Sequence, residues 1–283
     1  MTLTASTNDD TPTAGAPAGG CARASLADLA PELGLDATEP AFAEISFPVR
    51  RLKAGEALVR AGDRFEAIYV IRSGFLKTVR TDAAGNQMVL ALPMGGDTVG
   101  LDAIDPGRHG ADVIALDTTV VVVVPYARLA QLSRTYSGLE RALFRAFSRQ
   151  IGRDHRLIWL LGTHNAESRL AAFLLDLSER FGRLGYSRTV FELRMTRQEI
   201  GSYLGIKLET ASRALSALAA AGIIGVNRRT ITLRDVPALR RVLEPREAAV
   251  RPEPASARAR AERARSAQRG GLPALGSMAL AAA

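Results

Sequence analysis

The sequence predicts an α+β fold in which a small β-rich domain is followed by one long helix and then by a compact helical unit with a β-hairpin. Three observations predict it. Turn-forming residues recur between short apolar segments over residues 48–126, and apolar residues recur at heptad-like spacing over 127–161. A capped helix, a glycine turn and a second helix then follow one another over 196–221.

Five segments follow from these changes in sequence pattern. We predict a disordered tail over 1–24, a β domain over 25–130, a long helix over 131–162, a helical unit over 163–245 and a disordered basic tail over 246–283. The two tails are rich in Ala, Gly, Pro, Thr or Arg and carry few large apolar residues. The chain starts without a signal-peptide pattern and contains no run of 18 apolar residues, so we expect a cytoplasmic protein that does not associate with membranes.

The β domain is predicted from short apolar segments that end at turn residues. The clearest segments are 67–74, 75–80 and 87–92, and turns are expected at 62–63 and 95–97. This spacing is typical of a small barrel or sandwich.

The long helix carries a stripe of apolar residues. Its members are Leu139, Leu143, Phe147, Ile151, Ile158 and Leu161. Such a stripe packs either on the β domain or against a second copy of the helix. We favour a dimer seam formed by Leu143, Phe147, Ile151 and Ile158, while the core interpretation remains open.

The region from Met195 to Leu215 has the pattern of a helix-turn-helix. Thr196 followed by Glu199 is a capping box, so a helix begins there. Gly201 permits close approach of the second helix, and Gly205 can adopt the positive φ that a sharp turn requires. The second helix would enter the major groove of DNA with its first turns.

Three residues of that second helix are predicted to read bases, namely Glu209, Ser212 and Arg213. Glutamate accepts from a cytosine amine, arginine binds guanine O6 and N7, and serine contacts a base edge or a thymine methyl group. An ordinary exposed i,i+4 ion pair between Glu209 and Arg213 is the alternative, but the surrounding motif favours base reading. Arg197, Lys207 and the hairpin-tip residues Arg228 and Arg229 are predicted phosphate contacts.

Composition supports an acidic partner only weakly. The net charge is +8, yet residues 246–283 contain seven Arg and three Glu and so hold half of it.

The single cysteine excludes a disulfide or a multi-cysteine metal site within one chain. We find no metal-binding His/Cys spacing, no phosphate-binding glycine loop and no nucleophile motif, so an enzyme is not expected.

Several stretches resemble the CRP/FNR family of bacterial regulators, and within it the FNR branch. They are 53–56, 61–63, 69–74, 96–104, 165–173 and 195–213, in family order across residues 45–235. The resemblance implies a cyclic-nucleotide-binding-like β-roll, a dimerisation helix and a C-terminal winged helix-turn-helix. It implies a homodimer on double-stranded DNA with TTGAT-type half-sites read by Glu209, Ser212 and Arg213. RNA polymerase is an implied partner, and Gly85, in a turn similar to a polymerase-contacting loop, favours activation.

Two departures from the family pattern concern the cofactor. The FNR iron–sulfur cluster needs four cysteines, but the N-terminal segment offers Cys21 alone and the fourth position falls on Val122. The cyclic AMP pocket needs an Arg-Ser pair, which is missing from 108–112. We therefore expect neither cofactor. Three inputs remain open: no ligand, a haem or nitric oxide signal with His109 or His155 as ligand, and Cys21 as a redox thiol.

The resemblance also assigns Asp154 to the dimer seam. The matching aspartate in FNR opposes its twin and keeps the protein monomeric until the cluster binds. Arg153 and Arg156 flank Asp154 here and are expected to neutralise it, which predicts a dimer that forms without a cluster. A ligand-binding scaffold without specific DNA readout is the competing class, and the intact set of base-reading residues disfavours it.

Overall fold

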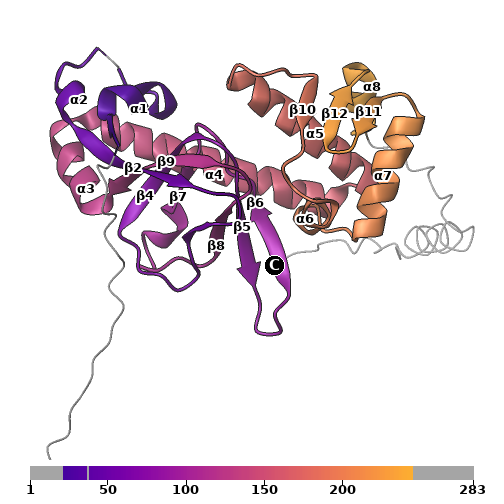
Figure 1. The fold of residues 1–283 in the computed structure, drawn as a ribbon, viewed down its shortest axis with the longest axis horizontal. Coiled ribbons are helices and arrows are strands. Elements are labelled where there is room, and N and C mark those ends of the chain that lie inside the picture. Colours follow the sequence, from indigo (N-terminus) through magenta and orange to yellow (C-terminus); the bar gives the residue numbers. More distant parts are fainter. Residues whose placement is uncertain (1–21, 37, 245–283) are drawn as a thin grey trace, which may run out of the picture. The chain divides into compact units, whose positions relative to one another are not determined.

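The computed structural model describes residues 22–36 and 38–244, and the described residues as far as Leu243 form one compact unit. The predicted α+β architecture is confirmed, with a β-roll, a long helix and a small helical domain in sequence order (Figure 1). None of the described helices is both long and apolar enough to cross a membrane.

The β-roll is made of two antiparallel sheets. The first has the order β1 (Arg23–Ser25), β2 (Ser46–Leu52), β9 (Thr119–Pro125), β4 (Ala67–Ser73) and β7 (Thr98–Val99). The second has the order β3 (Ala57–Val59), β8 (Asp112–Ala115), β5 (Leu76–Thr81) and β6 (Gln87–Ala91). The first strand includes Arg23 and Ala24, which the sequence had assigned to the N-terminal tail; they are ordered because β1 pairs with β2.

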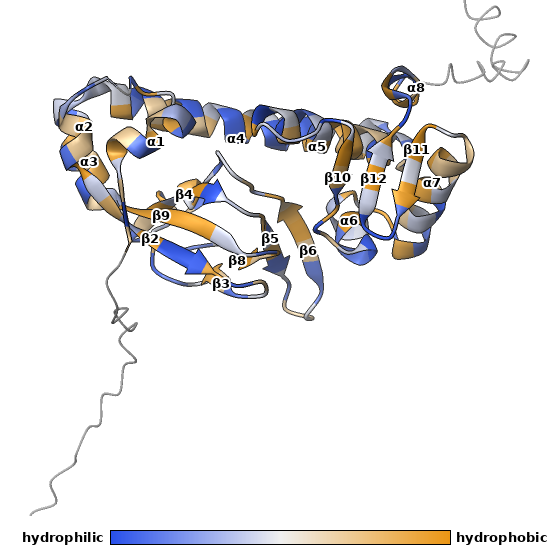
Figure 2. Cartoon of the chain, turned by 45° about the horizontal axis from the view of Figure 1, so that its top comes forward, coloured by the Kyte–Doolittle hydropathy of each residue, from blue (hydrophilic) through white to orange (hydrophobic). Residues whose placement is uncertain are grey.

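Strand β9 explains the unbroken run of valines. It lies between β2 and β4, its residues 120–124 are all valine, and much of it is coloured as hydrophobic in Figure 2. Val121 packs inside the roll, whereas Val122 and Val124 pack in a second cluster with residues of the helices. A strand that is covered on both faces needs apolar residues at successive positions rather than at alternate ones.

Four helices contribute to the cluster on the outer face of the first sheet. They are α1 (Leu26–Leu33), α2 (Ala41–Glu44), α3 (Tyr126–Thr135) and the beginning of α4 (Ser137–Thr163). The sequence predicted one helix over 131–162, but the chain breaks at Tyr136, which has φ −117° and ψ 93°. The break lets the Tyr136 ring pack edge-on against Phe42 at 5.3 Å between centroids, while its N–H still caps α3.

The C-terminal domain contains four helices and one sheet. The helices are α5 (Ala166–Arg183), α6 (Arg197–Tyr203), α7 (Leu208–Ala220) and α8 (Val236–Arg241), and the sheet has the order β10 (Val190–Glu192), β12 (Thr230–Leu233) and β11 (Ile224–Asn227). Its core also includes Val89 and Leu92 from the β-roll. The two domains therefore share a hydrophobic cluster instead of folding as separate bodies.

Candidate nucleic-acid interface

The N-terminus of α6 is fixed by the predicted capping box, which is confirmed. The Thr196 hydroxyl accepts from the Glu199 N–H at 3.2 Å, and the Glu199 carboxylate accepts from the Thr196 N–H at 2.7 Å. Two otherwise unpaired N–H groups are thus satisfied, and the helix starts at one defined residue.

Two glycines form the turn between α6 and α7, as predicted. A Cβ atom on Gly201 would lie 2.7 Å from the Ile206 carbonyl oxygen, so only glycine allows this close approach. Gly205 has φ +61°, in the left-handed region that favours glycine. The turn therefore holds α7 against α6 in a tight arrangement.

Helix α7 has one buried face and one outward face. The buried face consists of Ala211, Ala214, Leu215 and Leu218. Glu209 and Arg213 are exposed and Ser212 is half-buried, and these three lie within one turn. Glu209 and Arg213 form no ion pair with each other among the described residues, so both charged ends face solvent. Lys207 precedes the helix without a side-chain cap, which leaves the N–H groups of the first turn accessible to a phosphate.

The hairpin of β11 and β12 forms the predicted wing. Its tip, Arg228 and Arg229, is exposed, and Arg228 has φ +53°. Arg197 differs from the expected free phosphate contact, because its Nη2 donates to the Arg228 carbonyl at 3.4 Å and its Nη1 is buried without a hydrogen-bond partner among the described residues. Burial also lowers the pKa of the Arg197 guanidinium. Arg197 thus supports the wing from α6.

Arg169, which the sequence analysis did not single out, joins α5 to two other parts of the chain. Its guanidinium donates to the carbonyls of Leu161 at 2.6 Å and His164 at 2.9 Å, at the end of α4. It also donates to the carbonyls of Leu204 at 3.0 Å and Gly205 at 3.4 Å, in the turn before α7. One side chain therefore sets the position of α7 relative to α4.

A second connection runs from the β-roll to α6. Lys77 donates to the Glu199 carboxylate at 2.5 Å, and the Ser202 hydroxyl accepts from the Val89 N–H at 2.9 Å. Burial raises the pKa of Glu199, but hydrogen bonds from Lys77 and Thr196 outweigh this effect and hold the pKa below its ordinary value. Glu199 is thus ionised, and it both caps α6 and ties it to β5.

The expected dimer face of α4 is divided between two surfaces. Leu143 and Phe147 are half-buried against the β-roll cluster, because the first turns of α4 pack on the sheet. Ile151 and Ile158 remain 50% and 66% exposed, and so does Phe144 at 62%, which the sequence analysis missed. The exposed apolar line is therefore Phe144, Ile151 and Ile158.

Asp154 lies exposed beside this line, and neither Arg153 nor Arg156, which were expected to neutralise it, forms an ion pair with it among the described residues. The Gln150 amide donates to Asp154 at 3.0 Å, whereas Arg153 bonds to Asp97 at 2.8 Å. Successive residues of a helix point about 100° apart, so Arg153 points away from Asp154 and reaches Asp97 of the β-roll. Asp97 also pairs with Arg180 of α5 at 2.7 Å.

The region of the β-roll in which the Arg-Ser pair was expected to be missing contains a hydrogen-bonded arginine and a buried histidine. Arg108 donates to the Gly62 carbonyl at 2.8 Å, and His109 is 4% exposed between the rings of Phe65 and Tyr69. Burial lowers the pKa of His109, which favours the neutral imidazole.

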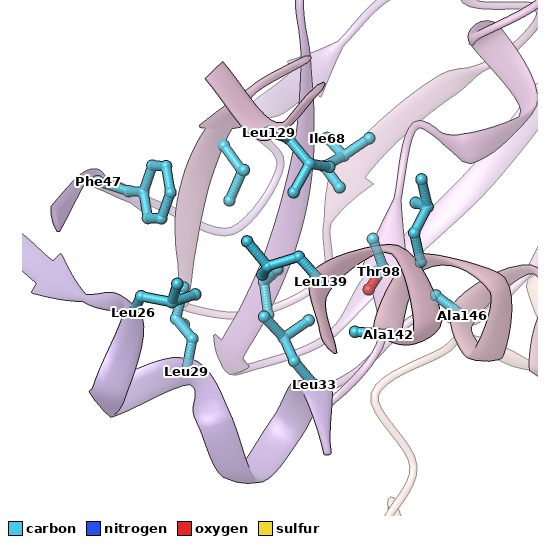
Figure 3. A pocket seen from close by; sticks show the side chains of 13 residues that line it. Leu26, Leu29, Leu33, Phe47, Ile68, Thr98, Leu129, Leu139, Ala142 and Ala146 are labelled. Atoms are coloured by element: carbon cyan, nitrogen blue, oxygen red, sulfur yellow. The ribbon is translucent and has the colours of Figure 1, made fainter. Parts of the chain in front are cut away.

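A separate cavity, which none of residues 108–112 lines, is smaller than a nucleotide site. It lies between α1, the first sheet and α4, measures about 30 Å³ and is lined by apolar side chains apart from Thr98 (Figure 3). Ligand pockets usually measure about 300–1,000 Å³.

The remaining candidate ligands for a cofactor are dispersed. His155 lies exposed on α4, far along the chain from the buried His109. Cys21 lies outside the described residues. Within the described ranges, no group of three or more His, Cys, Asp or Glu side chains could hold a metal ion.

Comparison with known proteins gives matches in both domains. A model of the Crp-like helix-turn-helix domain matches residues 168–242, and a model of the cyclic nucleotide-binding domain matches residues 49–136. The Transcriptional regulatory protein btr of Bordetella pertussis is 38% identical over 193 residues, which are 68% of this chain and 80% of that protein. The Fumarate and nitrate reduction regulatory protein of Escherichia coli (strain K12) is 38% identical over 188 residues, 66% of this chain and 75% of that protein.

Solved structures agree with the sequence matches. FixK2 from Bradyrhizobium japonicum is 27% identical with a TM-score of 0.64, and the match covers 69% of this chain and 96% of FixK2. Together with the capped helix, the glycine turn and the wing, these similarities show that the chain belongs to the CRP/FNR family of DNA-binding transcriptional regulators.

Proposed function

We propose that this protein binds palindromic DNA with TTGAT-type half-sites as a homodimer and does so without a four-cysteine iron–sulfur cluster. The observation that carries the proposal is the outward face of α7, where Glu209, Ser212 and Arg213 lie within one turn of a helix that follows the capped helix α6 and the glycine turn.

The chemistry of this face suits a half-site that contains a G·C pair. Arg213 can donate two hydrogen bonds to guanine O6 and N7, and Glu209 can accept from the amine of the paired cytosine. Ser212 can contact a neighbouring base edge or thymine methyl. Lys207 and the wing tip supply positive charge for the flanking phosphates, and these contacts position the helix without selecting a sequence.

The homodimer is supported by the exposed apolar line of α4. Phe144, Ile151 and Ile158 are each at least half exposed, and large apolar groups at helical spacing in water favour pairing with an apolar partner. A two-fold dimer would present two copies of α7 to the two halves of a palindrome.

The control of DNA binding is proposed to be independent of an iron–sulfur cluster. The chain contains one cysteine, whereas such a cluster takes four thiolate ligands. An absorption spectrum of protein purified without oxygen tests this: we expect no iron–sulfur or haem bands. A Soret band would instead favour a haem-responsive regulator, and broad iron–sulfur absorption would contradict the proposal.

We further propose that the turn between β5 and β6 contacts RNA polymerase. Asp82 accepts hydrogen bonds from the N–H groups of Ala84 and Asn86, both at 2.9 Å, and Gly85 takes φ +83° within this exposed turn. A fixed, exposed turn is a suitable protein-contact surface. Transcription in vitro that falls in a turn variant with unchanged DNA affinity would support this role.

DNA binding itself is tested by fluorescence anisotropy on three duplexes at fixed salt: the palindrome, a single half-site and a scrambled sequence. We expect tight binding to the palindrome, weaker binding to the half-site and the weakest binding to the scrambled duplex. Equal affinity for the palindrome and the scrambled duplex would contradict specific readout. Sedimentation of the same sample gives the oligomeric state.

A further inference from the structure

Trp159 is an exposed aromatic residue on α4 that the exposed apolar line does not include. It is the chain's single tryptophan, and 61% of its surface is exposed. Its ring meets His164 edge-on at 4.5 Å, and no other aromatic ring lies against it among the described residues. A large exposed indole beside a dimer face is a candidate for insertion into a partner.

A cleft of about 460 Å³ lies along α4, beside the C-terminal domain. Its lining combines apolar side chains, among them Leu157 of α4, Phe173 of α5 and Tyr203 next to the turn before α7, with charged ones, among them Asp154, Arg156 and Asp176. Burial raises the pKa of Tyr203 to about 12, so the phenol is neutral and this wall carries no charge from it. The protomer's own Trp159 borders the cleft but, being 61% exposed, does not fill it.

The positions of these residues around α4 follow from the helical repeat of about 100° per residue. With Ile151 at the centre of the seam, Ile158 lies within about 20° of it. Trp159 then lies on one flank at about 80°, whereas Asp154 and Leu157 lie on the opposite flank at about 60° and 120°.

The direction of the two helices follows from DNA binding. The C-terminal end of α4 leads through Thr163–Asn165 into the domain that carries α7. Both copies of α7 must reach the same face of one duplex, so the two α4 helices run parallel about a two-fold axis. In a parallel two-fold pair, a given flank of one helix faces the opposite flank of its partner.

We propose that, in the homodimer, Trp159 of each protomer crosses the seam and inserts into the partner's cleft, next to the partner's Leu157. The inserted indole would then extend the apolar contact from α4 towards Tyr203 and the turn before α7. Trp159 would then contribute both to the pairing of the two α4 helices and to the position of the partner's α7. The inference rests on the homodimer proposed above.

The single tryptophan makes this insertion directly measurable. Emission and iodide quenching of the full-length protein are compared with those of Ile158→Asp, which places a carboxylate on the seam at a residue that is 66% exposed and so should fold as a monomer. We expect the dimer to show blue-shifted emission and a several-fold smaller quenching constant than the monomer. Sedimentation of both samples shows which species is present.

A mixed dimer identifies the site that the indole enters. One subunit keeps Trp159. The other subunit carries Trp159→Phe, Cys21→Ser and Glu179→Cys, and a nitroxide is attached to the new cysteine. Glu179 is suitable for the label because it borders the cleft and is exposed. Strong quenching of the single indole is expected with this label, and little quenching with the same label on Arg128→Cys, an exposed position of α3.

The outcomes separate the inference from the homodimer itself. Absence of a dimer in sedimentation would overturn both. A stable dimer whose Trp159 stays open to iodide, or is quenched equally from both label positions, would overturn the insertion alone.

Discussion

Replacing Arg169 by lysine removes the planar guanidinium that joins the end of α4 to the turn before α7. Arginine reaches carbonyls on both sides because its five N–H donors have a fixed fork geometry, whereas a lysine ammonium is a single point with three donors. We expect Arg169→Lys to keep the positive charge at the C-terminus of α4. It should lose the hydrogen bonds either to the carbonyls at the end of α4 or to those in the turn before α7.

The size of the effect follows from the four hydrogen bonds. The bonds to Leu161, His164 and Leu204 are 2.6–3.0 Å long, and the one to Gly205, at 3.4 Å, is weak. A hydrogen bond with a charged partner contributes about 1.5–3 kcal/mol, and hydration of the released carbonyls offsets part of each loss. Losing one or two of the strong bonds should lower the free energy of unfolding by about 2–3 kcal/mol.

Two measurements distinguish a positioning role from simple destabilisation. Urea unfolding gives the stability loss, and Arg183→Lys, at an exposed position on the same helix, is the matched control that should change it by less than about 0.5 kcal/mol. Anisotropy on palindromes with the half-site spacing changed by one base pair gives the spacing preference. We expect Arg169→Lys to broaden that preference while single half-site affinity is retained. An unchanged spacing preference in folded Arg169→Lys would refute the reasoning.

Two further predictions concern the fixed start and end of α6. Gly205→Ala should lower the free energy of unfolding by about 1–2 kcal/mol, because φ is +61° at this position. In the same urea titration, the control Gly110→Ala should have no effect, because φ is ordinary there and no atom lies near the added Cβ. Equal effects of the two substitutions would show that backbone strain at Gly205 is not the cause. Glu199→Gln should cost about 1 kcal/mol at pH 7, because glutamine can keep the capping bond to the Thr196 N–H but loses the ion pair with Lys77. Since the folded-state pKa of Glu199 is held below its ordinary value, this difference should be complete well above the unfolded value of about 4.3 and disappear as the pH falls through the folded-state pKa. A difference that is the same at every pH at which the protein stays folded, down to its acid unfolding, would exclude a role for the carboxylate charge.

Local signals in the sequence predicted the helix-turn-helix well. The capping box depends on two residues three apart, and the turn depends on glycines whose backbone positions other residues cannot adopt. Both features are decided by neighbours in the chain, so the pattern alone suffices. The same holds for the wing, where two short apolar strands flank a polar tip.

Contacts between distant segments could not be predicted in the same way. Arg169 in α5 and Lys77 in β5 each find partners in or next to α6, and nothing in their local sequence indicates it. The apolar stripe on α4 was predicted, but not that part of it packs on the β-roll and part of it is exposed. Leu143 faces the β-roll and Phe144 faces outwards, because one helix serves two surfaces about 100° apart. Similarly, Arg153 bonds to Asp97 rather than to the neighbouring Asp154.

The central claim, that Arg213 reads a guanine in each half-site, is tested most directly by a double-mutant cycle. Affinities of the wild type and Arg213→Ala are measured by anisotropy on the TTGAT palindrome and on the palindrome with the G·C pair of each half-site changed to A·T, all at one salt concentration. The wild type should lose about 1–3 kcal/mol for each changed pair, whereas Arg213→Ala should bind the two duplexes almost equally. If Arg213→Ala weakens binding to both duplexes by the same factor and the G·C preference persists in full, the claim is contradicted.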